Sequence, residues 1–234
     1  MNRRIVKSFI MKASAISLVS LFSLAIHAAD GVSSASWSSP VSTFSNATLS
    51  SGSEGIGISA SLGGYLTGVY ENRLQVATKE DLEYTEVNYL LLNNASNSGL
   101  TIESSWSEDV EFYRSGSEHN AHYDDVNSVD VGLFSTLFFA DPRVTAYPKM
   151  QVGYMWGDSI VDTTYVKFEV AVRFDFDDKM WVGATPLYSH GMDGVEIDEL
   201  GGSIEAGMKL SETFGISASV DSNEEFLGNV IFAF

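Results

Sequence analysis

Every second residue of the last nine positions of the sequence is glycine or a large apolar residue. Phe226, Gly228, Val230, Phe232 and Phe234 fall on one side of an extended chain. A period of two over this length predicts a β-strand with one apolar face. At the edge of a soluble sheet such a strand promotes aggregation. In a sheet that closes on itself inside a membrane, its backbone has a neighbour and its side chains have lipid. The pattern therefore favours a closed, membrane-spanning sheet.

The first residues have the form of a secretory signal peptide. Four cations precede an apolar run over residues 13–26, and small residues close the run at Ala28 and Ala29. The run is shorter than the ~20 residues that a membrane-spanning helix needs. We therefore expect residues 1–29 to be a signal peptide, cleaved after Ala28 or Ala29.

The charge balance and the absence of cysteine exclude several functions. The sequence has 13 Lys and Arg against 31 Asp and Glu, which argues against a nucleic-acid partner because a polyanion needs a basic surface. With no cysteine there is no disulfide, zinc–thiolate site or cysteine nucleophile. No glycine-rich phosphate loop or nucleophile elbow is present, and no cofactor is expected.

Alternating apolar segments of strand length recur along the chain between turn residues, as in a membrane barrel. Ten of them are clear: 66–76, 87–91, 100–112, 129–139, 144–156, 166–176, 179–188, 200–210, 214–220 and 226–234. The predicted fold is all-β, an antiparallel up-and-down transmembrane β-barrel.

The number of strands depends on residues 30–76. Residues 56–62 also alternate, and a three-residue loop at 63–65 would join them to the segment 66–76. Because single-chain bacterial barrels have even strand numbers, an eleventh strand requires a twelfth, for which a Ser-rich stretch within 41–50 is the candidate. The alternative is a ten-stranded barrel, with a flexible Ser/Gly-rich segment at 30–55 and one overlong strand at 56–76. We favour twelve strands.

The connections between these segments alternate in kind. The short set comprises 93–99, 140–143, 176–179 and 210–213, and the more acidic set comprises 78–83, 114–125, 157–162, 189–198 and 221–225. Short periplasmic turns and longer extracellular loops are typical of membrane barrels. If the carboxyl terminus faces the periplasm, the acidic loops lie outside the cell.

A signal peptide, alternating strands and a terminal phenylalanine together resemble the bacterial outer-membrane β-barrel class, over residues 56–234. The size resembles that of its small, monomeric, porin-like channel proteins, and no motif of one family is matched. The resemblance implies a Gram-negative outer membrane, contact with its lipid, and recognition of the terminal strand, Phe226 to Phe234, by the barrel-insertion machinery.

Placing the polar face of each strand inward defines a set of charged lumen residues that could select ions. Seven are acidic and five are basic: Glu71, Arg73, Glu103, Asp109, Glu111, Lys149, Lys167, Glu169, Arg173, Asp175, Glu205 and Lys209. A conducting lumen of this composition would mildly prefer cations. The alternative is a salt-bridged, packed interior.

Three histidines outside the signal peptide fall near acidic residues. His119 and His122 precede Asp124 and Asp125, and His190 lies near Asp193. Two such loops meeting above the barrel could bind a divalent metal ion or activate water. Their spacing fits no fixed ligand motif, so solvated loop residues are the simpler interpretation, and we assign neither a metal site nor a catalytic residue.

Three functional hypotheses follow. The first is a narrow passive channel for small solutes with a mild cation preference. The second is a non-conducting barrel whose acidic loops bind a partner or divalent cations. The third is a hydrolase at the rim that uses the loop histidines and aspartates. Conductance separates the first from the second.

Overall fold

The computed structural model describes residues 37–53, 55–112 and 121–234. Most of these residues lie in β-strands, and there is one short 3₁₀ turn, η1 (Glu80–Leu82). The strands are β1 (Asn46–Gly52), β2 (Gly55–Thr67), β3 (Tyr70–Lys79), β4 (Tyr84–Asn93), β5 (Ser98–Phe112), β6 (Ala121–Ser135), β7 (Leu137–Phe138), β8 (Val144–Gly157), β9 (Thr163–Asp175), β10 (Met180–Asp193), β11 (Asp198–Lys209), β12 (Phe214–Asp221) and β13 (Phe226–Ala233).

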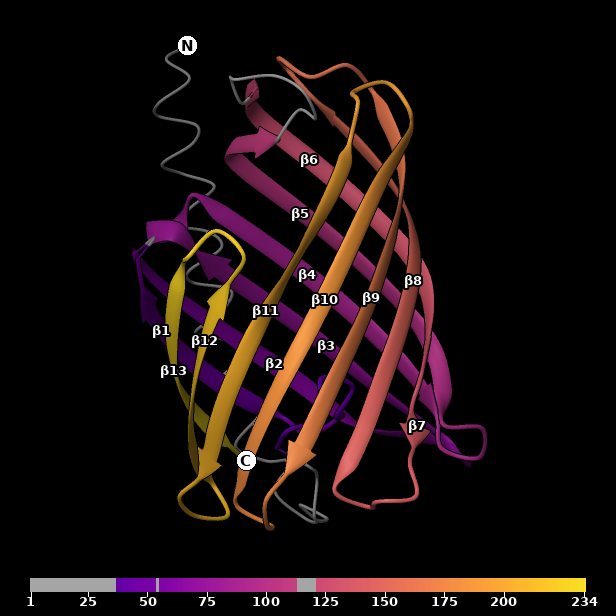
Figure 1. Cartoon of the computed structure of the whole chain (residues 1–234), viewed down its shortest axis with the longest axis vertical. Coiled ribbons are helices and arrows are strands. Elements are labelled where there is room, and N and C mark those ends of the chain that lie inside the picture. Colours follow the sequence, from indigo (N-terminus) through magenta and orange to yellow (C-terminus); the bar gives the residue numbers. More distant parts are fainter. Residues whose placement is uncertain (1–36, 54, 113–120) are drawn as a thin grey trace.

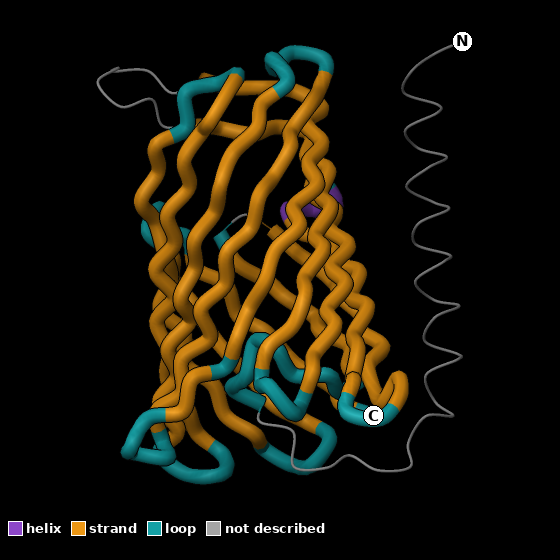
Figure 2. Tube along the Cα trace, turned by 90° about the vertical axis from the view of Figure 1, so that its right-hand side faces the viewer, coloured by secondary structure: helices purple, strands orange, loops and turns teal. Residues whose placement is uncertain are grey.

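Each strand pairs antiparallel with its neighbours in sequence, except that β6 and β7 both pair with β8, and the first strand pairs with the last. Along this seam Asn46 lies opposite Ala233 and Gly52 lies opposite Leu227. The sheet therefore closes into the barrel seen in Figures 1 and 2. Its wall has twelve strands, as the sequence favoured, because the two-residue β7 is a continuation of β6.

A proline explains why β7 is separate from β6. β6 pairs with β8 as far as Phe134 opposite Lys149, and β7 resumes in the same register with Leu137 opposite Ala146. In that register Pro148 lies across from the break. Because proline has no backbone N–H to donate, the hydrogen bonds to β8 are interrupted at this position only, and they resume at β7.

In contrast to a soluble protein, the barrel has polar side chains inside and large apolar side chains outside. The largest fully buried side chains are polar, namely Gln151, Thr101, Thr163 and Ser61. Large apolar side chains lie on the outer face, where Leu200 is 79% exposed. Alternation along every strand produces both faces at once, since successive side chains point to opposite sides of a sheet. An apolar outer band and a polar interior are the pattern of a transmembrane barrel.

The connections between strands lie at the two ends of the barrel (Figure 1). We call the end that contains Phe234 and the connections 68–69, 94–97, 139–143, 176–179 and 210–213 the turn end, and the opposite end the loop end. The connection predicted at 189–198 is shorter than expected, because β10 reaches Asp193 and β11 begins at Asp198. Apart from the connection that contains residues 113–120, the loop end is built from connections as short as those of the turn end.

The start of the barrel differs from the sequence prediction in two places. Strand β1 begins at Asn46 and not near residue 41. The expected loop at 63–65 is wrong, as is the alternative of one overlong strand, because those three residues lie inside β2 and pair with Glu71, Asn72 and Arg73. The chain turns at Gly68, whose φ of 56° suits glycine, and Val69. Among the described residues, no helix is both long and apolar enough to cross a bilayer.

Candidate functional site: the lumen of the barrel

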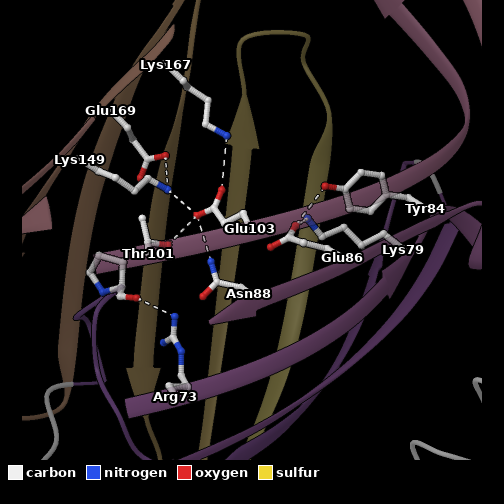
Figure 3. Close-up of polar contacts among 11 residues, drawn as sticks. Arg73, Lys79, Tyr84, Glu86, Asn88, Thr101, Glu103, Lys149, Lys167 and Glu169 are labelled. Atoms are coloured by element: carbon white, nitrogen blue, oxygen red, sulfur yellow. Dashed lines mark hydrogen bonds and ion pairs between the residues drawn. The ribbon is translucent and has the colours of Figure 1, made fainter. Parts of the chain in front are cut away.

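A carboxylate in the middle of the lumen organises the largest polar network. Glu103 on β5 accepts from Lys149 at 3.0 Å and from Asn88 at 3.0 Å, and pairs with Lys167 at 3.5 Å. Lys149 also pairs with Glu169 at 3.1 Å. Figure 3 shows these side chains converging from neighbouring walls of the barrel. Parity places all of them inward, and the ion pairs satisfy charges that the wall partly removes from water.

A second ion pair lies nearer the turn end. Arg173 on β9 donates to Glu205 on β11 at 2.9 Å and to Thr185 at 3.3 Å. Its side chain is only 7% exposed, because it packs against Gly183 on the strand between them. A methyl group at position 183 would lie 2.4 Å from the guanidinium. The strand therefore leaves room for this arginine.

Residues 37–45 lie inside the barrel at the turn end. They form no strand, and they contact inward-facing side chains of several walls. Arg173 donates from Nε to the backbone oxygen of Ser38 at 3.0 Å, and Arg73 donates to the backbone oxygens of Ser42 and Pro40 at 2.9 and 3.2 Å. The segment that the sequence predicted as a weak strand or a tail is thus part of the lumen.

Three cavities follow one another along the lumen. The loop-end cavity, about 270 Å³, is lined by Tyr84, Asp130, Tyr165 and Glu199 among others. The central cavity, about 160 Å³, shares Glu86 and Glu103 with it and ends on Pro40 and Val41. The turn-end cavity, about 430 Å³, is lined by Trp37 and Ser38 together with Asp175, Lys179 and Glu212.

Apolar side chains narrow one side of the loop end. Val126, Met155 and Tyr165 from the wall form a buried cluster with Ile160 and Ile197 from two connections. The connection between β10 and β11 is fastened to the start of β9, because the amide of Val195 donates to the Thr163 hydroxyl at 2.9 Å. The opening at this end is therefore bounded partly by a buried apolar cluster.

The structure places most of the charged residues that the sequence assigned to the lumen on its inner side. Ten of them contact other lumen side chains or line a lumen cavity: Glu71, Arg73, Glu103, Lys149, Lys167, Glu169, Arg173, Asp175, Glu205 and Lys209. Asp109 and Glu111 belong to β5 by their backbone, opposite Asp124 and His122, and their side chains lie outside what the structure describes.

The histidines do not assemble a site in the described part of the chain. His190 on β10 points away from the lumen and stacks on Tyr188 at 6.3 Å between ring centroids. His119 lies outside the described residues, and only the backbone of His122 is described, in β6. No group of histidine and acidic side chains that could hold a metal ion occurs within residues 37–53, 55–112 and 121–234.

Sequence reasoning missed several lumen residues. Glu86, Asp130 and Glu199 line the loop-end cavity. Each alternates with an outward apolar neighbour, so strand parity alone could have found them. The intrusion of residues 37–45 had no such signal, because a Ser-rich stretch without periodicity reads as a linker.

Comparisons with known proteins agree with the fold. No family model matches the sequence, and no match was found among curated proteins. Among solved structures, a KdgM porin in complex with disordered oligogalacturonate superposes with a TM-score of 0.53 at 8% identity, covering 81% of this chain and 98% of that one. The chain has the fold of bacterial outer-membrane porins. A NanC porin also matches, with a TM-score of 0.49 at 8% identity over 82% of this chain and 98% of that one.

Proposed function

We propose that this protein is a passive channel of the bacterial outer membrane that admits small polar solutes and mildly prefers cations. In this proposal its apolar outer face contacts lipid, its terminal strand is recognised by the insertion machinery, and it works as a monomer. The turn end then faces the periplasm. A closed barrel with this polarity and the porin fold support the location.

The observation that carries the proposal is the series of cavities along a polar lumen. The loop-end and central cavities share Glu86 and Glu103, and ionisable side chains line both. Such a lining can replace part of the hydration shell of a passing solute.

The carboxylates of the loop-end cavity support a cation preference. Glu199 lines the cavity and forms no ion pair within the described chain. Asp130 likewise forms no ion pair there, and one of its carboxylate oxygens has no hydrogen-bond partner. The KdgM porin was captured with oligogalacturonate, a polyanion. Because carboxylates repel polyanions, we do not transfer that substrate to this chain.

Planar-bilayer recording tests the proposal. We expect the purified protein to conduct, with a reversal potential in a KCl gradient that reports a cation preference. Glu199→Gln should shift that potential toward zero. Asp198→Asn is the matched control, because Asp198 is the preceding residue of β11 and lies exposed on the outer side. An equal shift for both variants would refute the role of Glu199.

The non-conducting alternative has one observation in its favour. Residues 37–45 fill the turn end, and ion pairs cross the middle of the lumen. If neither the complete protein nor a variant with that segment displaced conducts, the barrel is structural or binds a partner at its surface. Within the described residues the rim hydrolase has no comparable support, since His190 points outward.

A further inference from the structure

We propose that residues 37–45 form a plug at the turn-end mouth of the lumen, which must leave its seat before solutes pass. The existence of the seat follows from geometry alone. The consequence for transport rests on the proposed channel function, and the two are tested separately below.

The plug is enclosed although it has no regular secondary structure. None of its nine residues is exposed, and Ser38 and Ser45 retain only 5% of their accessible surface. Its sequence, WSSPVSTFS, carries no charge. The rings of Trp37 and Phe44 pack on each other at 5.4 Å between centroids. An uncharged segment that folds back on itself in this way fills a charged lumen without adding a charge that must be paired.

Two arginines hold the plug from nearly opposite walls. Arg73 projects from β3 and Arg173 from β9, which are five strands apart in the ring of twelve. Both donate to backbone oxygens of the plug and not to its side chains. Hydrogen bonds from a charged donor are among the stronger ones in proteins. Loss of one such donor should shift the ratio of seated to displaced plug by about tenfold.

The barrel wall is hollowed where the plug lies. A methyl group added at Gly63 on β2 would stand 1.8 Å from the backbone oxygen of Thr43. A methyl group at Gly215 on β12 would stand 2.8 Å from the ring of Trp37. Only glycine permits these approaches, so the wall and the plug are matched at two places on different sides.

The base of the plug is a fixed point from which it could swing. The amide of Gly63 donates to the Ser45 hydroxyl at 3.1 Å, and the amide of Phe234 donates to the backbone oxygen of Ser45 at 3.1 Å. Strand β1 starts at the next residue. The central cavity ends on one side of the plug and the turn-end cavity on the other. Movement about Ser45 would join the two cavities.

Thiol labelling tests the seat without reference to transport. The sequence has no cysteine, so Ser38→Cys introduces a single thiol. We expect a maleimide to label it far more slowly than Ser211→Cys in the exposed turn between β11 and β12. Replacing Arg73 and Arg173 by glutamine should speed labelling of Cys at position 38 by about tenfold or more. Equally fast labelling at positions 38 and 211 in otherwise unchanged protein would overturn the plug.

Bilayer conductance tests the consequence with a variant that leaves both arginines in place. Gly63→Ala pushes the wall against Thr43, whereas Gly228→Ala meets no atom closer than 3.6 Å and is the matched control. We expect Gly63→Ala alone to raise conductance severalfold. Equal conductance of both variants and the unchanged protein would overturn the plug as a barrier. Protection of position 38 with no conductance in any variant would keep the seat and refute the channel.

Discussion

Lys149 stands between two carboxylates, and its Nζ lies 3.0 Å from Glu103 and 3.1 Å from Glu169. No other lysine of the described lumen pairs with two carboxylates at such short range. Lys149→Gln would leave both carboxylates facing each other across a half-buried space. We expect it to lower the free energy of unfolding by about 2–3 kcal/mol, as found when one member of a desolvated pair is removed.

Lys167→Gln is the natural comparison for that variant. Lys167 makes one contact with Glu103, at 3.5 Å, and its side chain is 22% exposed. Its replacement should cost about 1 kcal/mol or less. Urea unfolding of the barrel in detergent micelles measures both values. Equal losses, or a larger loss for Lys167→Gln, would show that Lys149 is not the central cation of the network.

The connection between β7 and β8 contains an ion pair that predicts a pH effect. Arg143 lies 2.7 Å from Asp141 and lowers the pKa of that carboxyl to about 2 from 3.8, chiefly by side-chain hydrogen bonding. A lowered pKa stabilises the turn above pH 3.8, and this contribution is lost as the pH falls toward 2. Arg143→Gln should return the pKa of Asp141 toward 3.8. NMR titration of the carboxyl carbons measures it.

The same titration contains its own control. The pKa of Asp177 is also lowered, but by the backbone amides of Lys179 and Met180. It should therefore stay low in Arg143→Gln. If both aspartates shift together, the variant has disturbed the whole turn end and the assignment of Arg143 as the cause fails.

Pro148 predicts a local change in the strand ladder. Pro148→Ala supplies an N–H opposite the break between β6 and β7. We expect this new amide to exchange with solvent as slowly as that of Val152 farther along the strand, because a complete ladder protects its amides. Amide hydrogen exchange measures this. Fast exchange at position 148 would mean that the break has a cause other than proline.

Gly207 on β11 leaves space for an inward tryptophan. A methyl group there would lie 2.0 Å from the ring of Trp181, which is 4% exposed. Gly207→Ala should lower the free energy of unfolding by about 1–3 kcal/mol, as overpacking does in other interiors. Gly228→Ala should have little effect, since its nearest neighbour is at 3.6 Å. Urea unfolding compares the two, and equal effects would contradict the packing argument.

Strand parity predicted the parts of this molecule that repeat. It predicted ten clear strand segments and the inward side of residues such as Glu103 and Lys149, because a period of two encodes both faces of a barrel wall. Twelve strands were favoured only through the rule that single-chain bacterial barrels have even strand numbers. Parity failed where the chain lacks a period. Residues 63–65 have the composition of a glycine turn but lie within β2. Their strand conformation depends on pairing with Glu71, Asn72 and Arg73 of β3, which the local sequence does not reveal. Likewise, nothing local in residues 37–45 indicates that arginines from two distant strands hold them.

The pairing of β1 with β13 joins the two strands of the barrel that lie farthest apart in the sequence. Contacts of such long sequence separation form slowly, because the entropy cost of closing a large loop precedes the hydrogen bonds that offset it. Residues 37–45 run directly into β1, and Ser45 bonds to Phe234. The late step that closes this seam would therefore also place the plug in the lumen. A newly assembled barrel would then be closed from the moment of its insertion, and the membrane would not become leaky during that step.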